Sequence, residues 1–260
     1  MRATFQFTLA TLAAAIFCHG TVTGSAASFT TNSFSDAFVT TGPSGNLSGD
    51  NFGGAGALSV AAPGLANGEF QSVLQFDTSA AVSSFNTQFG AHQWTIQSVT
   101  LQLTATPNNN PGTFNTTAAG LFNVSLMLNN SWTEGTGTPA SPTTTGITFN
   151  ALQSTFINNS VDQSLGTGLS FNGATSGAAS YSLTLSPTLL SDIGSGGDID
   201  LRLFADDSVV SMLVNSRSGG SGTSHPEIII NAIPEPGTIA LGALGLATIL
   251  GCRLVRRRVP

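Results

Sequence analysis

Apolar and polar side chains alternate in many short runs between residues 28 and 231, and clusters of Gly, Asn, Pro and Ser separate these runs. Alternation with a period of two is typical of a β-strand that buries one face. In SVTLQLTAT, for example, Val99, Leu101 and Leu103 share one face, and mostly polar residues occupy the other. The pattern predicts nine strands, in the segments FSDAFVT, GALSV, FQSVLQFD, SVTLQLTAT, LFNVSLML, YSLTLS, IDLRLFA, VVSMLVN and EIIIN.

One of these segments, LFNVSLML, predicts a buried face made by Phe122, Val124, Leu126 and Leu128. Only SPTLLSDI, residues 186–193, has helical features, because Pro187 stands in a first turn, where the missing N–H of proline removes no hydrogen bond. Strands at this spacing, without alternating helices, predict an all-β fold. We expect an antiparallel β-sandwich, and the length of the chain favours a jelly-roll form.

The composition is that of an ordered β protein rather than of a disordered chain. Only 8% of the residues are charged, lysine is absent and Gly occurs 30 times, whereas disordered chains are usually rich in Glu, Lys and Pro. Between residues 28 and 233 there are twelve acidic residues and two arginines, which gives a net charge of −10. Because binding to a nucleic-acid backbone needs several Lys or Arg side chains, we expect no nucleic-acid partner.

The N-terminus has the layout of a secretory signal peptide. Arg2 precedes an apolar run, residues 5–17, and small residues follow at positions 24–27. We expect the secretion machinery to export the chain and signal peptidase to cleave it near Ala26 or Ala27. Residues 1–27 are therefore predicted to be a removable signal. The two cysteines, Cys18 and Cys252, lie in terminal apolar segments, so the body is expected to contain no disulfide.

A second apolar run, residues 238–252, precedes an arginine cluster at the C-terminus. As a helix it would extend roughly 22 Å, which is shorter than the roughly 30 Å hydrocarbon core of a membrane. The arginines can reach the cytoplasmic headgroups and so orient a transmembrane helix with the body outside. The predicted membrane segment contains Ile239, Leu241, Leu244, Leu246, Ile249 and Leu250, and the predicted stop consists of Arg253, Arg256, Arg257 and Arg258.

This C-terminus resembles the PEP-CTERM sorting signal of bacterial exopolysaccharide-associated proteins. Pro234, Glu235 and Pro236 form the Pro-Glu-Pro motif, a Gly- and Ala-rich apolar segment follows, and arginines come last. The resemblance implies that an exosortase, a membrane protease-transpeptidase, processes the chain near this motif. It also implies a body that is anchored in the cytoplasmic membrane until processing and then lies in the cell envelope or extracellular matrix. Residues 232–260 form the predicted sorting region; an ordinary tail anchor is the alternative.

The body, residues 28–231, resembles the DNRLRE, or disaggregatase-related, β-sandwich domains of secreted bacterial and archaeal proteins. The resemblance rests on SDAFVT, NFGGAGALSV, QSVLQFD, IQSVTLQLTAT, NNSWTEGTGTPASPTTTGITFN and VNSRSGGSGTSHPEIII, in that order. The W-x-E-G-T turn and the closing S-R segment of the family match Trp132, Glu134, Gly135, Thr136, Ser216 and Arg217. The chain departs from the pattern at Phe149, where the family tends to have Trp in a strand. The resemblance implies an association with surface polysaccharide.

Trp132 and Trp94 are the candidate rings for stacking against a sugar. The alternative for Trp132 is a structural role, in which its ring packs the WTEGT turn onto the sandwich. In that arrangement Glu134 accepts hydrogen bonds from backbone N–H groups or from Arg217. We favour the structural role, with Arg217 as an ion-pair partner.

The body contains no recognised catalytic motif, and we assign no catalytic residue. Besides the acids it offers only His92, His225 and Tyr181 for proton transfer. A hard cation such as Ca²⁺ is the one candidate cofactor, because carboxylate oxygens are its preferred ligands. The candidate ligands are Asp198, Asp200, Asp206 and Asp207, and the alternative is that these are solvated turn carboxylates.

These features predict an exported, non-enzymatic structural or adhesive protein associated with exopolysaccharide. One alternative is a polysaccharide-binding module, which needs an exposed aromatic side chain. The other is a polysaccharide lyase or hydrolase, in which His92, His225 or Tyr181 would have to meet carboxylates in one groove.

Overall fold

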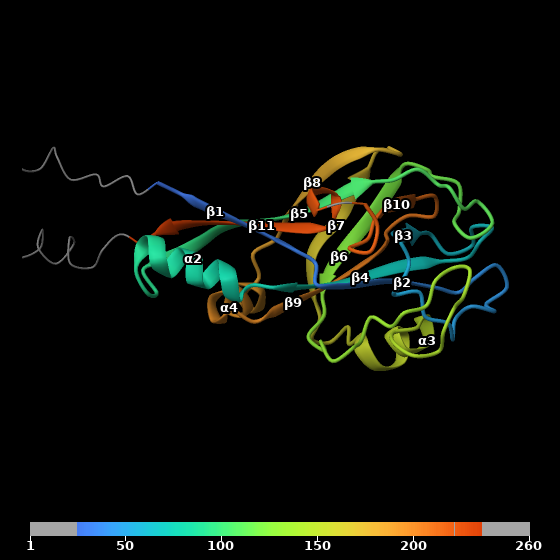
Figure 1. Ribbon diagram of the computed structural model, residues 1–260, viewed down its shortest axis with the longest axis horizontal. Helices are drawn as coiled ribbons and strands as arrows, with labels where there is room; N and C mark the ends of the chain where they lie inside the picture. The colour runs from blue at the N-terminus through green and yellow to red at the C-terminus, as the bar shows by residue number, and fades with distance from the viewer. Residues whose placement is uncertain (1–24, 221, 236–260) are drawn as a thin grey trace, which may run out of the picture. The chain divides into compact units, whose positions relative to one another are not determined.

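The computed structural model describes residues 25–220 and 222–235, and residues 27–232 form one compact unit. This unit is mostly antiparallel β-sheet with a few short helices (Figure 1). The predicted membrane segment and arginine cluster lie outside the described residues, as does the predicted signal peptide except for its last three positions. The strands are β1 (Ala27–Asn32), β2 (Ser35–Thr40), β3 (Ala57–Ala61), β4 (Phe70–Asp77), β5 (Trp94–Ala105), β6 (Gly120–Leu126), β7 (Gln163–Phe171), β8 (Gly177–Leu183), β9 (Asp198–Ala205), β10 (Ser211–Asn215) and β11 (Glu227–Pro234).

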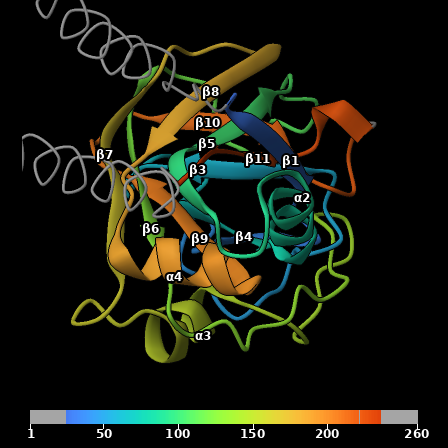
Figure 2. The same ribbon diagram turned by 90° about the vertical axis from the view of Figure 1, so that its left-hand side faces the viewer.

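The strands form one path of neighbours, β1-β11-β5-β10-β3-β4-β9-β6-β7, with β8 paired to β5 and β2 paired to β4. Two joins in this path are short: β10 meets β5 only through Val214 and Ala105, and β3 meets β4 only through Ala61 and Phe70. Strands β2, β4, β9, β6 and β7 lie on one side of the core, and the remaining strands lie on the other (Figure 2). The unit is therefore sandwich-like, in agreement with the predicted antiparallel β fold.

The core between the two groups of strands contains the residues that the alternation indicates. Val99, Leu101 and Leu103 of β5 are at most 1% exposed. The prediction for Leu128 was wrong, because β6 ends at Leu126 and the side chain of Leu128 is 43% exposed. The chain leaves the sheet after Leu126, so the alternating residues beyond it are not part of a strand.

The predicted helix is present as α4 (Pro187–Ser195), with Pro187 in its first turn. The Ser186 hydroxyl accepts a hydrogen bond from the N–H of Leu189 at 3.2 Å and so caps the helix start. Gly196 ends the helix in the left-handed conformation, with φ of 73°, which glycine adopts at little cost.

A longer helix, α2 (Ser79–Phe89), was not predicted. Of its eleven residues only Ala81 and Phe85 are buried, four positions apart. With only two buried apolar residues, the helical periodicity of this segment is too weak to predict a helix from the sequence. Helices α2 and α4 lie side by side and close one end of the core (Figure 1).

Two strands were also missed. β7 contains Gly166 and Gly168, and its register against β6 shifts twice, so its sequence does not alternate cleanly. β1 directly follows the predicted signal peptide and pairs along its whole length with β11. In that pairing Ala27 lies opposite Ala232, so the start and the end of the body are neighbours.

Residues 127–157, called the covering segment below, pack on the outer face of β2 and β4 (Figure 1). The segment contains α3 (Phe149–Ala151) and a π-helical turn, η1 (Leu152–Phe156). Outside the segment, a 3₁₀ turn, η2 (Gly222–Ser224), lies before β11. Phe149 begins α3, so it does not lie in the strand that the DNRLRE resemblance implies. The hydroxyl of Thr148 caps this short helix by accepting a hydrogen bond from the N–H of Ala151 at 3.2 Å.

Candidate functional site

The covering segment buries an apolar cluster against the sheet. Trp132, Met127, Ile147 and Leu152 from the segment contact Ala37, Val39 and Val73 of β2 and β4. Both faces of β2, and of β4 up to Phe76, are consequently buried, so the polar side chains of β4, Gln71 and Gln75, are buried as well. Polar residues lie beside this cluster as well, and hydrogen bonds join them into a network that connects β2, the turn before β3, the covering segment and the loop after β10.

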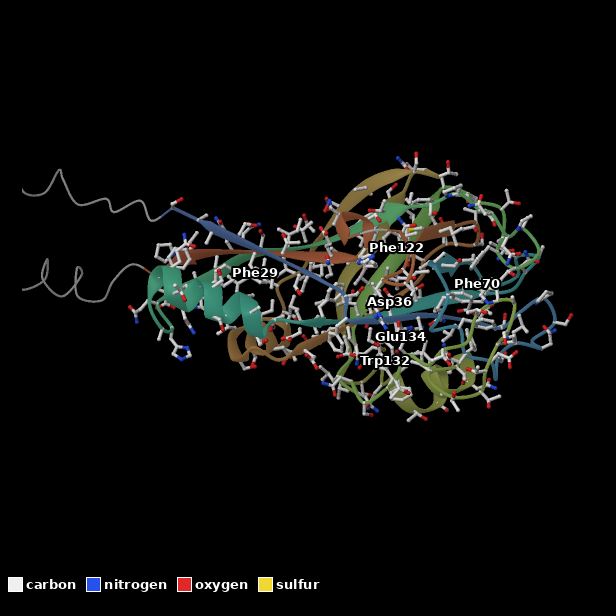
Figure 3. The ribbon with its side chains drawn as sticks, in the orientation of Figure 1. Phe29, Asp36, Phe70, Phe122, Trp132 and Glu134 are labelled. Carbon is white, nitrogen blue, oxygen red and sulfur yellow. The ribbon has the colours of Figure 1, made fainter. Side chains whose placement is uncertain are left out.

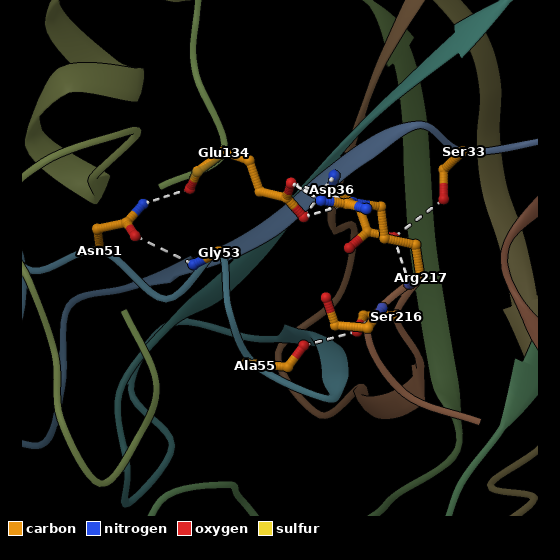
Figure 4. Close-up of polar contacts among 9 residues, drawn as sticks. Ser33, Asp36, Asn51, Gly53, Ala55, Glu134, Ser216 and Arg217 are labelled. Carbon is orange, nitrogen blue, oxygen red and sulfur yellow. Dashed lines mark hydrogen bonds and ion pairs between the residues drawn. The ribbon is translucent and has the colours of Figure 1, made fainter. Parts of the chain in front are cut away.

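An ion pair joins two segments at the surface of this network (Figure 4). The Arg217 guanidinium, which follows β10, donates from Nε to both carboxylate oxygens of Glu134, at 2.8 and 3.0 Å, and from Nη2 to Oε2. The Arg217 side chain is 40% exposed and that of Glu134 is 13% exposed. The W-x-E-G-T and S-R segments, which lie far apart in the sequence, therefore meet through these two side chains.

Asp36 of β2 lies beneath this ion pair and is fully buried (Figure 3). Its Oδ2 accepts hydrogen bonds from the Ser33 hydroxyl at 3.0 Å and from the backbone N–H of Arg217 at 2.8 Å. Its Oδ1 is buried and has no hydrogen-bond partner among the described residues. Burial raises the pKa of Asp36 to about 6, although the two hydrogen bonds oppose this rise.

Asn51 connects the covering segment to the turn before β3 (Figure 4). Its amide nitrogen donates to the carbonyl oxygens of Glu134 and Ile147, both at 2.7 Å. Its amide oxygen accepts from the N–H groups of Gly53 at 3.2 Å and Gly137 at 3.1 Å. One side chain that is 0% exposed thus satisfies four backbone groups from three parts of the chain.

Glycines allow this close approach. A Cβ atom on Gly53 would lie 1.9 Å from the carbonyl oxygen of Glu134, and one on Gly137 would lie 1.8 Å from the carbonyl oxygen of Asn51. Any other residue at these positions would push the two backbones apart. The local sequence does not mark Asn51 or Asp36 as network residues; the one signal is the run of glycines that follows Asn51 in NFGGAG.

A second buried carboxylate lies under Trp132. The indole Nε1 of Trp132 donates to Oδ1 of Asp200 at 2.8 Å, and these residues are 4% and 1% exposed. Oδ2 of Asp200 has no partner within the described part of the chain. Burial raises the pKa of Asp200 to about 6, and the hydrogen bond from Trp132 opposes the rise.

The two carboxyls predict an acid-favoured stability. Because the folded-state pKa values of Asp36 and Asp200 lie near 6 rather than 3.8, the folded protein holds protons that the unfolded chain releases. The resulting stabilisation is complete below about pH 4 and is lost as the pH rises to about 6. We expect the free energy of unfolding to be about 2 kcal/mol per carboxyl lower at about pH 7.5 than at about pH 4.5.

Urea unfolding at the two pH values measures this difference. The double variant Asp36→Asn, Asp200→Asn should show a much flatter profile. The pKa values of Asp77 and Asp207 are lowered, so the stability that they contribute is lost only below about pH 4, outside the compared window. A wild-type protein that becomes more stable from about pH 4.5 to about pH 7.5 would contradict the assignment.

Neither tryptophan offers an open ring for a sugar. Trp132 is buried as described above, and Trp94 is 8% exposed, packs on Phe85 at 5.1 Å between ring centroids and donates from Nε1 to Oδ1 of Asn86 at 2.8 Å. The ring of Tyr181 lies in the core, edge to face with Phe122 at 4.9 Å. Asp36 and Asp200 are likewise too deeply buried to contact a substrate in this conformation.

The four carboxylates considered for Ca²⁺ do not converge. Asp198 of β9 lies opposite Asp77 of β4, whereas Asp200 accepts a hydrogen bond from Trp132. Asp206 accepts from the amide of Asn123 at 2.8 Å beyond the other end of β9, about 20 Å along an extended strand from Asp200. Asp207 accepts from three backbone N–H groups, those of Leu121, Val209 and Val210. Within the described ranges no three His, Cys, Asp or Glu side chains are grouped to hold a metal ion.

The Pro-Glu-Pro motif follows the body without a spacer. Pro234 is the last residue of β11 and Glu235 comes directly after it, whereas Pro236 and the tail lie outside the described residues. Among the residues that the structure describes, no helix is both long and apolar enough to cross a membrane.

The chain thus consists of a mostly β body and a processing motif that begins in the last strand of that body. This places it in the class of folded proteins that carry a C-terminal sorting signal. Residues 232–258 match the family model of the PEP-CTERM protein-sorting motif, which confirms the predicted sorting signal. The motif indicates an exported protein that an exosortase-type system sorts and that is membrane-anchored before processing. Comparison with curated proteins finds no match to the chain.

Proposed function

We propose that the chain is a non-enzymatic structural or adhesive protein, delivered by its sorting tail to the cell envelope or extracellular matrix and associated there with exopolysaccharide. The observation that carries this proposal is the PEP-CTERM motif at residues 232–258. Signal peptidase and an exosortase would each remove one end, leaving the body free of both apolar termini.

The pairing of β1 with β11 supports this account. Since Ala27 lies opposite Ala232, the two expected processing points flank one end of a single strand pair. Both ends can be removed without cutting into the core, because β1 begins at Ala27 and β11 ends at Pro234. The mature body would then retain all eleven strands.

The finer description of the body is also a proposal: a DNRLRE-like domain with a jelly-roll order of strands. The contact of Glu134 with Arg217 supports it, because these residues come from two of the matched segments. The absence of a catalytic role is proposed because Tyr181, Asp36 and Asp200 are each at most 8% exposed.

The sorting proposal is tested in a host that has an exosortase. We expect mass spectrometry to find a protein that begins near Ala27 and ends near Pro236, in the envelope or medium. The double variant Pro234→Ala, Pro236→Ala should remain unprocessed at its C-terminus and should accumulate in the membrane fraction, because the processing enzyme no longer recognises the motif.

The matched control is Pro63→Ala, which removes a proline from an exposed turn of the body. We expect this variant to be processed like the wild type. Full-length wild-type protein in the cytosol, or normal processing of the double variant, would refute the proposed route.

A further inference from the structure

The covering segment leaves part of the outer sheet face open. Over β2, over most of β4 and at Asp200 of β9 the outward side chains are buried, but from Arg202 onward on β9, and on β6 and β7, they are half-buried or exposed. Strand pairing aligns Arg202 of β9 with Ser125 of β6, and Ser125 in turn with Ser164 of β7. We call the resulting surface the open face; it consists of Arg202, Phe204, Asn123, Ser125, Ser164 and Thr167.

The side chain of Arg202 is held in place by contacts that leave some of its hydrogen-bond donors without a partner among the described residues. Its Nε donates to Oε1 of Gln71 at 2.7 Å, and its guanidinium carbon lies 4.1 Å from the centroid of the Phe204 ring. Within the described residues its two terminal nitrogens have no hydrogen-bond partner and no carboxylate at salt-bridge distance, in contrast to Arg217. A guanidinium that is oriented by stacking and retains free donors is a pre-organised binding group.

The charges around the open face favour a neutral ligand. Glu69 and Asp162 both interact electrostatically with Arg202. Asp206 and Asp207 follow the end of β9, where they accept hydrogen bonds from the amide of Asn123 and from the backbone N–H of Leu121. Four carboxylates and one guanidinium repel a polyanion, whereas a hydroxyl group can accept from the guanidinium and donate to a carboxylate.

The composition of the open face favours a saccharide over a protein partner. Asn123 lies opposite Phe204 in the strand pairing, and Ser125 and Ser164 lie level with Arg202 on the next two strands. The Ser164 and Thr167 hydroxyls are hydrogen-bonded to each other at 3.0 Å. Protein interfaces are usually richer in aromatic and apolar groups at their centre. A sheet face with hydrogen-bonding groups on three adjacent strands suits an extended chain of hydroxyl-bearing rings.

We propose that the open face binds a neutral polysaccharide chain, with Arg202 and Phe204 as its anchor. The inference rests on the proposed function, since it supplies the attachment of the exported body to matrix polysaccharide. It names a surface that the sequence did not suggest, because the candidate aromatic residues were then Trp94 and Trp132.

Native gel electrophoresis of the exported protein, in gels that contain a soluble polysaccharide, tests the proposal. We expect at least one of dextran, galactomannan and hydroxyethyl cellulose to slow the wild-type protein, and alginate, a polyanion, to leave it unaffected. Arg202→Ala and Phe204→Ala should each weaken the apparent affinity roughly tenfold. Arg202→Lys should restore only part of the loss, because it keeps the charge but not the planar group.

Two further variants distinguish a loss of binding from a loss of folding. Ser164→Glu adds a carboxylate at an exposed position and should also abolish the retardation while leaving the thermal midpoint unchanged. Phe34→Ala removes an aromatic side chain that is 46% exposed outside the open face, and it should bind like the wild type.

The proposal is overturned if no neutral polysaccharide slows the wild type, if only alginate does, or if all variants are slowed equally. Self-association that Ser164→Glu abolishes, without any retardation by polysaccharide, would instead assign the face to a second copy of the chain. Sorting is assessed separately by the processed termini. A protein that is processed but binds no polysaccharide contradicts only this inference, whereas an unprocessed protein contradicts the proposed function.

Discussion

Replacing Asn51 by alanine is expected to lower the free energy of unfolding by about 4 kcal/mol or more. The truncation leaves the carbonyl oxygens of Glu134 and Ile147 and the N–H groups of Gly53 and Gly137 without their side-chain partner. Each buried, unsatisfied backbone group costs about 1–3 kcal/mol, and the costs are not additive. Because a domain of this kind is stable by about 5–15 kcal/mol, this loss would remove from about a quarter to most of the stability.

Urea unfolding measures the effect, and Asn109→Ala is the matched control. Asn109 is an exposed asparagine in the loop after β5, and its replacement should change stability by less than about 0.5 kcal/mol. Asn51→Asp should also be strongly destabilising, because the carboxylate keeps the acceptor but loses the donor to two carbonyl oxygens. If Asn51→Ala proved as stable as the control, the network would not hold the covering segment in place.

Trp132→Ala is expected to cost about 4 kcal/mol, as is usual when a large buried aromatic side chain is truncated. Two causes combine: the apolar cluster with Val73 and Leu152 loses its largest member, and Asp200 loses the hydrogen bond from the indole Nε1. The resulting cavity lies directly over β4 and β9. The covering segment should therefore become easier to cleave by protease than the rest of the body.

Trp132→Phe separates the two causes. It retains most of the ring volume but removes the Nε1 donor, so the pKa of Asp200 should rise further. The variant should consequently be more destabilised, relative to wild type, at about pH 7.5 than at about pH 4.5, where Asp200 is neutral. Adding Asp200→Asn should remove this pH dependence; if it persists in the double variant, the carboxyl of Asp200 is not its source.

Local pattern was sufficient wherever one face of a strand is buried and the other is polar. Val99, Leu101 and Leu103 were placed correctly for this reason, and Pro187 marked the start of α4. Pattern failed where few residues of an element are buried or where the strand pairing is irregular. Helix α2 was missed because only two of its residues are buried, and β7 because its glycines and register shifts disturb the alternation.

The candidate chemistry divides in the same way. The pairing of Glu134 with Arg217 could be considered from composition, because the body has only two arginines and many acids. The burial of Asp36, the four backbone contacts of Asn51 and the stacking of Arg202 on Phe204 depend on segments that are distant in the chain. No local signal distinguishes a buried aspartate from the other aspartates of this body.

The amino-acid sequence by itself was sufficient to predict the sorting signal and the β character of the body. Both the sorting motif and the strand alternation are patterns of residues that are close together in the chain. Only the tertiary structure decided which polar groups are buried, that the covering segment hides Trp132, and that one sheet face stays open around Arg202. The physical reason is that burial and hydrogen bonding here arise between segments as far apart as Asp36 and Arg217, and a linear pattern contains no information about such distances.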